Sequence, residues 1–496
     1  MLTQSLPSSL ARPLLLALFA LGLPAAAAPS DLPPDLASAY ASIRPADVYQ
    51  TCRQLCLPRF AGRFPGTPEY RELCELIATT LEAHRLEPGA EGSFLQPYSS
   101  PCTTVEDASL KLILPAAEGT AEEPVDLEPG VDFLPLLYSD SGVAEGGVVF
   151  VGFGISAPEL GYDDYGGMDV KGRFALCFRG TPDDSNRAFQ DHDEHRTRMR
   201  AARERGALGL IYIYETPIAN PNGERLERFF PAMISDRQAG RILAGNGTDA
   251  AKLRAELLET KQPRSFVTGA RVQIAVKARY VADAVAYNVI GIVRGSDPAL
   301  RHESVVVGAH LDHCGRHLGL LFPGANDNAS GSACVLQAAR AFSRLKQRPR
   351  RSVVFVLFGG EERGLEGSNL FVEKPPAAAG RMMVMLNLDM VGEGDGSGAA
   401  IRPGYPALKE AVESADRTVG TVRSLHEFSG PPGVRGSDYA PFYLAGLPCL
   451  TFSSNGPHVH YHETRDTIYR INPDMLADMT RLTFLTAFYL ADGPSL

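Results

Sequence analysis

Short apolar runs alternate with helical segments from about residue 271 onward, and this alternation constrains the fold more than any other feature. The apolar runs lie at 287–293, 304–309, 352–358, 383–388 and 448–452, and helical periodicity covers 329–345, 406–415 and 474–489. Short apolar runs bounded by turns are typical of buried parallel strands. Helices between such strands cover both faces of a sheet. We therefore predict an α/β fold with a mixed, mostly parallel sheet flanked by helices.

Polar side chains follow these predicted strands at the points where the strands end. In open α/β sheets the carboxyl edge of the strands is where ligands bind. The side chains that we expect at this edge are His310, Asp312, Asp327, Glu361, Glu362, Asp389 and His462.

Imidazole and carboxylate groups together form a ligand set that suits Zn²⁺, with Mn²⁺ or Co²⁺ as substitutes. Two histidines and three carboxylates are too many for one open zinc site, but they suit two ions that share a carboxylate. A second glutamate beside a ligand glutamate can serve as a base for a metal-bound water. Taken singly, Asp327 could be only a helix N-cap and Glu361–Glu362 an acidic pair at a helix start. Spacing alone does not choose among His458, His460 and His462, which a strand would place on one face.

The residue strings at these positions resemble the M28 family of zinc aminopeptidases. They match the family's H-x-D, G-A-x-D-N-x-S-G, E-E, N-x-D-M and Y-H-x-x-x-D-T motifs, and 59–68 resembles its N-terminal R-x-A-G-T-P loop with extra residues. The matching positions are His310 to Asp312, Gly324 to Gly331, Glu361–Glu362, Asn387 to Met390 and Tyr461 to Thr467.

The resemblance implies two Zn²⁺ per chain and a role for each residue. One zinc would take His310, Asp327 and Asp389, and the other would take Asp327, Glu362 and His462. Glu361 would be the general base on the metal-bridging water. Asp312 would hold the imidazole of His310, and Tyr461 would hydrogen-bond the developing oxyanion. In the 436–442 stretch Tyr439 replaces a family histidine.

The resemblance also divides the chain into parts. Residues 36–130 and 271–496 would form the M28-like zinc peptidase domain. Between them, 136–270 has short strands alternating with Gly/Asp-rich turns, and it resembles an inserted, β-rich protease-associated (PA) domain. In this family the insert shapes substrate access and has no chemistry of its own.

The first 28 residues read as a cleaved secretory signal, so we expect a secreted or periplasmic protein. Arg12 precedes the apolar run 14–23, and 25–28 offers an A-x-A cleavage site. No later segment is apolar enough to insert into a membrane. The net charge of -10 disfavours nucleic acid as a partner. The clustered Cys52, Cys56, Cys74 and Cys102 could form one or two disulfides or remain buried thiols.

The leading function is therefore a secreted di-zinc aminopeptidase that acts on peptides. A glutamate-carboxypeptidase-like exopeptidase is the alternative, in which Arg435 or Arg465 would bind a C-terminal carboxylate; the short chain beyond His462 counts against it. A single-zinc acyltransferase and a non-catalytic receptor or binding module are further alternatives, and the complete ligand set disfavours both. His313, Cys314 and His317 are interpreted as residues of a loop and rim, and the oligomeric state is not indicated.

Overall fold

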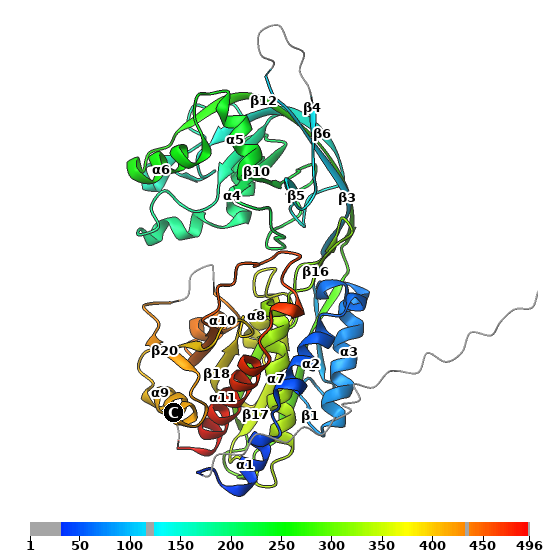
Figure 1. Ribbon diagram of the computed structural model, residues 1–496, viewed down its shortest axis with the longest axis vertical. Helices are drawn as coiled ribbons and strands as arrows, with labels where there is room; N and C mark the ends of the chain where they lie inside the picture. Colours follow the sequence, from blue (N-terminus) through cyan, green and yellow to red (C-terminus); the bar gives the residue numbers. More distant parts are fainter. Residues whose placement is uncertain (1–30, 116–123, 432–435, 495–496) are drawn as a thin grey trace, which may run out of the picture.

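The computed structural model describes residues 31–115, 124–431 and 436–494. Two lobes are visible, joined by a pair of long strands (Figure 1). The predicted signal sequence lies outside the described residues. Among the helices within the described ranges, none is long and apolar enough to cross a membrane.

The first lobe is built on a mixed sheet. Its central pairings β17–β14, β14–β18 and β18–β21 are parallel, whereas β13 pairs antiparallel with β17 and β19 pairs antiparallel with β21. The strand order is β1 (Glu87–Pro88), β13 (Val285–Val293), β17 (Ser352–Phe358), β14 (Glu303–His310), β18 (Arg381–Leu388), β21 (Cys449–Ser454), β19 (Ser397–Ile401) and β20 (Val422–Glu427), with β2 (Leu95–Ser99) also on β13.

Helices cover both faces of this sheet because successive side chains of each strand point to opposite faces. Val305, Val307 and Ala309 of β14 share one core with α1 (Pro34–Ala41), α2 (Pro45–Leu55), α3 (Pro68–Ala83), α7 (Gly331–Ser343), α9 (Pro406–Val419) and α11 (Pro473–Asp492). Val306 faces the other core, with α8 (Glu366–Glu373) and α10 (Tyr439–Leu444). The predicted fold class, an α/β sheet between helices, is confirmed.

Local sequence sets the starts of several helices. Thr67 accepts a hydrogen bond from Tyr70 N at the start of α3, and Asn472 accepts from Asp474 N and Met475 N at the start of α11. In both helices a proline occupies the first turn, where a missing N–H costs nothing. The N-terminal helices α1 and α2 are separate, with α1 ending at Ala41 and Pro45 beginning α2.

The second lobe contains another sheet with its own cores on both faces. Helices α5 (Asp236–Ala244) and α6 (Ala250–Thr260) pack on one face and α4 (His195–Glu204) on the other. The strand order is β4 (Pro124–Leu127), β3 (Cys102–Ile113), β12 (Ser265–Val281), β6 (Gly142–Val151), β9 (Phe174–Phe178), β10 (Gly209–Tyr214), β11 (Ala232–Ser235) and β5 (Phe133–Pro135). Two small hairpins, β7 (Ser156–Ala157) with β8 (Tyr162–Asp163) and β15 (Gly315–His317) with β16 (Leu320–Phe322), complete the strands.

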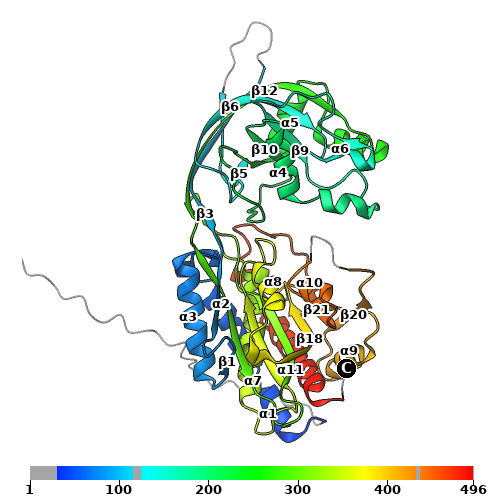
Figure 2. The same cartoon turned by 180° about the vertical axis from the view of Figure 1, so that it is seen from behind.

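The long antiparallel strands β3 and β12 run from this sheet towards the first lobe, as both views show (Figure 2). The sheet therefore extends outside 136–270 at both ends. The boundaries of the second domain at 136 and 270 remain a prediction. The pairing of β3 with β12 favours boundaries nearer to Cys102 and Val281.

None of the eight cysteines, all of which lie in the described ranges, forms a disulfide. Cys52, Cys74 and Cys102 are buried, and Cys56 is half-buried. In this structure the four clustered cysteines are therefore free thiols, which is the second of the two alternatives.

Candidate metal centre

The ends of the central strands bring the five predicted metal ligands together. His310 is the last residue of β14, Asp389 directly follows β18, and Glu362 follows β17 by a short loop. Asp327 lies in an irregular turn, Ala325–Ser330, that leads into α7. The fifth ligand, His462, comes from the loop between β21 and α11.

These donor atoms form two clusters that share Asp327. His310 Nε2 lies 3.3 Å from Asp327 Oδ1 and 3.3 Å from Asp389 Oδ1. His462 Nε2 lies 3.2 Å from Asp327 Oδ2 and 2.8 Å from Glu362 Oε2. One oxygen of Asp327 therefore faces each cluster, which is the arrangement of a bridging carboxylate.

Asp466 fixes the turn that carries Asp327, and sequence reasoning assigned it no role. Its buried carboxylate accepts hydrogen bonds from Asn326 N at 2.8 Å and from Asp327 N at 3.0 Å. Asn328 holds the other side of the turn by donating from Nδ2 to Leu388 O. The only available signal was the position of Asp466 within the Y-H-x-x-x-D-T motif.

The structure separates the three histidines that spacing left equivalent. The 458–462 segment is a turn, not a strand, and His458 and His462 have positive φ. His458 contacts Asn326, and His460 pairs with Glu463. Only His462 reaches Asp327 and Glu362.

The second lobe contacts this histidine directly. His462 Nδ1 lies 2.8 Å from Ala219 O, and Ala219 N donates to His462 O at 2.9 Å. A carbonyl on the second ring nitrogen is the usual device that orients a ligand histidine. The second lobe therefore helps to position the imidazole of His462.

Asp312 and Glu361 also lie at the centre. The buried Asp312 carboxylate accepts hydrogen bonds from Glu361 N at 3.1 Å and Glu362 N at 3.3 Å. His310 Nδ1 lies 3.2 Å from Asp312 O and 3.9 Å from Asp312 Oδ1. In this structure the Asp312 carboxylate holds the glutamate loop, while its main-chain carbonyl is the group nearest to the imidazole.

Burial is the main cause that raises the pKa of Glu361, and the nearby carboxylates of Glu362 and Asp389 add to it against the lowering effect of His310. Burial also opposes ionisation of Asp327, yet hydrogen bonds from His310 and His462 hold its pKa well below the usual value. The surroundings therefore favour the protonated form of Glu361 and the ionised form of Asp327.

The expected rim position of His313, Cys314 and His317 is wrong. All three are buried, because β15 and β16 fold the loop against the 58–63 segment. His313 Nδ1 lies 2.7 Å from Glu362 Oε1. His317 Nδ1 accepts from Val105 N, which joins the loop to β3.

A cavity of about 410 Å³ opens beside the clusters and is lined by both lobes. Tyr461 lines it with its ring stacked on His462, with 3.8 Å between the centroids. The second lobe contributes Arg179, His195, Ile218, Asn220 and Asn222 to the lining. The first lobe contributes Glu361, Glu362, Asp389 and Ser437, among others. Sequence reasoning missed the residues of the second lobe, because no local pattern marks them.

Two further positions lie away from the cavity lining. The Tyr439 ring stacks on Phe428 with centroids 4.9 Å apart. Arg465 pairs with Glu463 at 2.6 Å, and its side chain is 63% exposed. Arg435 falls outside the described residues.

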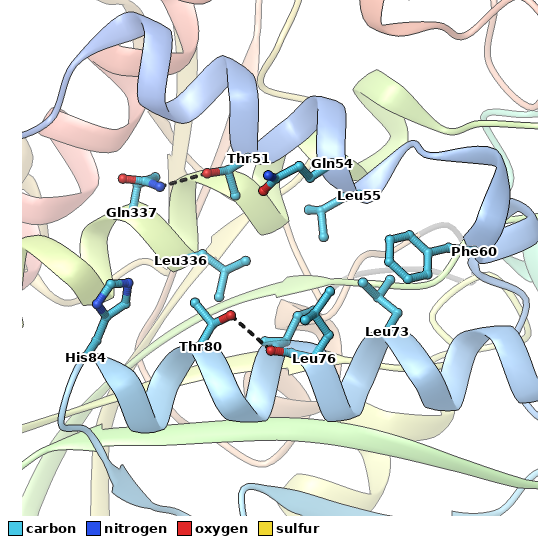
Figure 3. A pocket seen from close by; sticks show the side chains of 11 residues that line it. Thr51, Gln54, Leu55, Phe60, Leu73, Leu76, Thr80, His84, Leu336 and Gln337 are labelled. Carbon is cyan, nitrogen blue, oxygen red and sulfur yellow. Dashed lines mark hydrogen bonds between the residues drawn. The ribbon is translucent and has the colours of Figure 1, made fainter. Parts of the chain in front are cut away.

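A second, smaller cavity lies between α2, α3 and α7 (Figure 3). Its volume is about 40 Å³, which is room for one or two water molecules. Its lining is mostly apolar, and Gln337 Nε2 donates to Thr51 Oγ1 across it. It contains no carboxylate and is too small for a peptide.

The donor set beside the larger cavity fits two zinc-type cations. Each cluster offers three imidazole or carboxylate donors, which is the number that open zinc sites use. Neighbouring donor atoms lie 2.8–3.3 Å apart. Donors around a tetrahedral zinc ion are separated by about 3.3 Å, given bonds of about 2.0–2.1 Å.

Comparison with known proteins agrees with this chemistry. Residues 288–487 match the model of Peptidase family M28. The chain is 31% identical over 222 residues to leupeptin-inactivating enzyme 1 of Streptomyces exfoliatus, covering 42% of this chain and 46% of that one. It is 34% identical over 173 residues to an aminopeptidase of Pseudomonas aeruginosa, covering 32% and 30%.

The chain thus spans less than half the length of these two relatives. A solved zinc aminopeptidase from Bacillus subtilis superposes with a TM-score of 0.59 at 21% identity, covering 92% of this chain and 97% of that one, so the fold is shared. The resemblance in the motifs is confirmed by the family match, which contains all five predicted ligands: residues 288–487 of this chain are similar to peptidase family M28.

Proposed function

We propose that this protein is a zinc-dependent aminopeptidase that removes residues from the free N-terminus of peptides. The observation that carries the proposal is the pair of donor clusters sharing Asp327, with Glu361 beside them, at the wall of a cavity of about 410 Å³. The M28 match and the named relatives support the same activity.

Two zinc ions held by the clusters would supply Lewis-acid polarisation of the scissile carbonyl and would lower the pKa of a nearby water. His310, Asp327 and Asp389 would hold one ion, and Asp327, Glu362 and His462 the other. Glu361 is close to His310 and Asp389 but is not needed to complete either cluster. It would accept the proton of the attacking water and pass it to the leaving amine.

The remaining lining residues would orient the peptide. The carboxylates at the cavity wall, Glu361 and Asp389 among them, suit the ammonium group of a free N-terminus. Tyr461 would donate a hydrogen bond to the oxyanion of the tetrahedral intermediate. The cavity wall from the second lobe would limit how far a substrate extends.

We propose in addition that the segment around 136–270 is a PA domain and that the protein is exported. The separate sheet and cores of the second lobe support the first idea. The charged, apolar and small-residue regions within 1–28 support the second. Sequencing the N-terminus of protein recovered from the source cell's exterior or periplasm tests it: an intact Met1 would contradict cleavage.

A matched set of three peptides tests the direction of attack. The free peptide and its C-terminal amide should both lose their N-terminal residue, whereas the N-acetyl copy resists because acetylation removes the ammonium charge. Mass spectrometry of the products measures this directly. Equal cleavage of the acetylated peptide would contradict the aminopeptidase assignment.

A glutamate-carboxypeptidase-like activity is the second candidate, and Arg179 is the observation that favours it. Arg179 is the one guanidinium among the described residues that line the cavity. It lies over the Tyr214 ring, 5.8 Å from the centroid, and forms no ion pair with a carboxylate in the described part of the chain. If it binds a substrate carboxylate, the C-terminal amide should resist and the C-terminal residue should be released from the other two peptides.

Chelation is expected to abolish activity, and added Zn²⁺ is expected to restore it, because all donors belong to one shared site. Elemental mass spectrometry of the active protein should find about two ions per chain. Full activity after exhaustive chelation, or one ion per chain at full activity, would contradict the two-zinc proposal.

A further inference from the structure

His313 places a third imidazole at the centre, beside the second donor cluster. Its side chain is buried, and Nδ1 lies 2.7 Å from Glu362 Oε1 and 4.0 Å from Asp327 Oδ2. Its ring meets that of His462 edge to face, with 5.4 Å between centroids and 82° between planes. This residue belongs neither to the H-x-D motif nor to the five expected ligands.

The surrounding backbone fixes the ring in this place. His313 N donates to Arg63 O at 3.3 Å. Gly324, which has a φ of 55°, packs so close that a Cβ there would lie 2.4 Å from His313 Cγ. A side chain at 324 would therefore displace the imidazole, and glycine is what allows the ring to face Glu362.

From these contacts we propose that His313 Nδ1 is a fourth protein ligand of the second metal position, beside Asp327, Glu362 and His462. The inference deepens the proposed function, since it concerns one of the two metal positions on which that function rests. His313 Nδ1 lies 2.7 Å from Glu362 Oε1 and 4.0 Å from Asp327 Oδ2, and His462 Nε2 lies 2.8 Å from Glu362 Oε2 and 3.2 Å from Asp327 Oδ2. These distances bracket the separation of about 3.3 Å expected around a tetrahedral zinc ion, and the Glu362 carboxylate offers one oxygen to each imidazole.

The consequence is an asymmetry between the two positions. The first has three protein donors, and Asp389 among them is partly exposed towards the cavity with 22% of its side chain accessible. The second has four protein donors, all buried. Structural zinc sites are filled by four protein ligands, whereas catalytic sites keep a position open. The second position should therefore hold its ion more tightly, and the first should exchange first.

Two other roles are possible for the same contacts, and the experiment separates them. His313 could only donate a hydrogen bond to Glu362 Oε1, without binding metal. Alternatively, the thiol of Cys314 could be the extra ligand, since it lies within 4.8 Å of donor atoms of His313, Glu362 and His462.

The test is a Co²⁺ titration of the chelated full-length protein, followed by visible absorbance and by competition with a chelator of known affinity. No substrate is involved, so the outcome is independent of whether the protein proves to be an aminopeptidase. His313→Asn is the informative variant, because its amide can still donate to Glu362 from about the Nδ1 position but is a poor metal ligand. His460→Asn is the matched control, since His460 pairs with Glu463 and touches neither cluster.

We expect the first equivalent of Co²⁺ to give the intense visible bands of a tetrahedral ion in the wild type and in His460→Asn. In His313→Asn these bands should weaken, and affinity should fall by about 100-fold or more, beyond the 10–100-fold typical of losing a hydrogen-bonding partner. Equal thermal melting of the chelated variants shows that folding is unaffected.

Three results would overturn the proposal. Wild-type bands and an affinity within about tenfold in His313→Asn would leave His313 as a hydrogen-bond donor only. A sulfur-to-cobalt charge-transfer band that Cys314→Ser removes would assign the ligand to the thiol. Weak, non-tetrahedral bands at the first equivalent in the wild type would exclude a closed four-ligand position.

Discussion

Replacing Glu361 with glutamine is expected to lower kcat by about 10²- to 10⁴-fold while both metal positions stay filled. The amide keeps the shape of the side chain but cannot accept a proton from water. Each donor cluster is complete without Glu361, so elemental analysis of the variant should still find the wild-type number of ions.

The neighbouring glutamate supplies a matched control, because the same substitution one residue later should have a different effect. Glu362 contacts His462 through Oε2 and His313 through Oε1. Glu362→Gln should therefore weaken metal binding as well as turnover, and extra Zn²⁺ should recover part of its activity. Turnover near wild type in Glu361→Gln, or metal loss in that variant alone, would show that the roles of the two glutamates are wrongly assigned.

The fold and the donor positions could be predicted from sequence because both depend on local patterns. β14 and β17 are short, wholly buried strands, so their apolar runs mark both ends, and polar residues directly beyond them fall on one edge of the sheet. The places of His310 and Asp389 at the sheet edge follow from the strand ends, since each lies at or next to the end of its strand. Their predicted roles as ligands also needed the joint occurrence of the other side chains and the M28 motifs.

Other parts of the centre depend on contacts between distant segments, which periodicity does not encode. His313 looked like a loop residue because its burial depends on Gly324 and on the loop that contains Arg63. The choice of His462 over its neighbours depends on a turn with positive φ and on Ala219, 243 residues earlier in the chain. Periodicity and spacing reveal neither contact, and only the Y-H-x-x-x-D-T motif singled out His462.

Among the contacts between distant segments, we expect those of Arg63 to have the largest effect on stability. Its guanidinium is fully buried and donates to four main-chain carbonyls, at distances of 2.6–3.3 Å: Leu55 O, Leu311 O, Pro323 O and Gly324 O. Leu311 directly precedes Asp312, and Pro323 and Gly324 closely precede Asp327 in the chain. The side chain therefore ties the N-terminal segment to the loops that carry His313 and Asp327, two of the proposed metal ligands.

Arg63→Met is expected to lower the free energy of unfolding by about 3–5 kcal/mol, because it keeps most of the buried volume but leaves these carbonyls without donors. Urea denaturation of the chelated protein measures this without the contribution of bound metal. Arg59→Met is the control, since Arg59 pairs with Glu72 at the surface, where an ion pair contributes about 0–1 kcal/mol. The variant should also bind the first equivalent of Co²⁺ less tightly than Arg59→Met does, because loss of the tie frees the loops of Asp327 and His313. If both variants unfold at the same urea concentration, Arg63 does not hold the two loops in place.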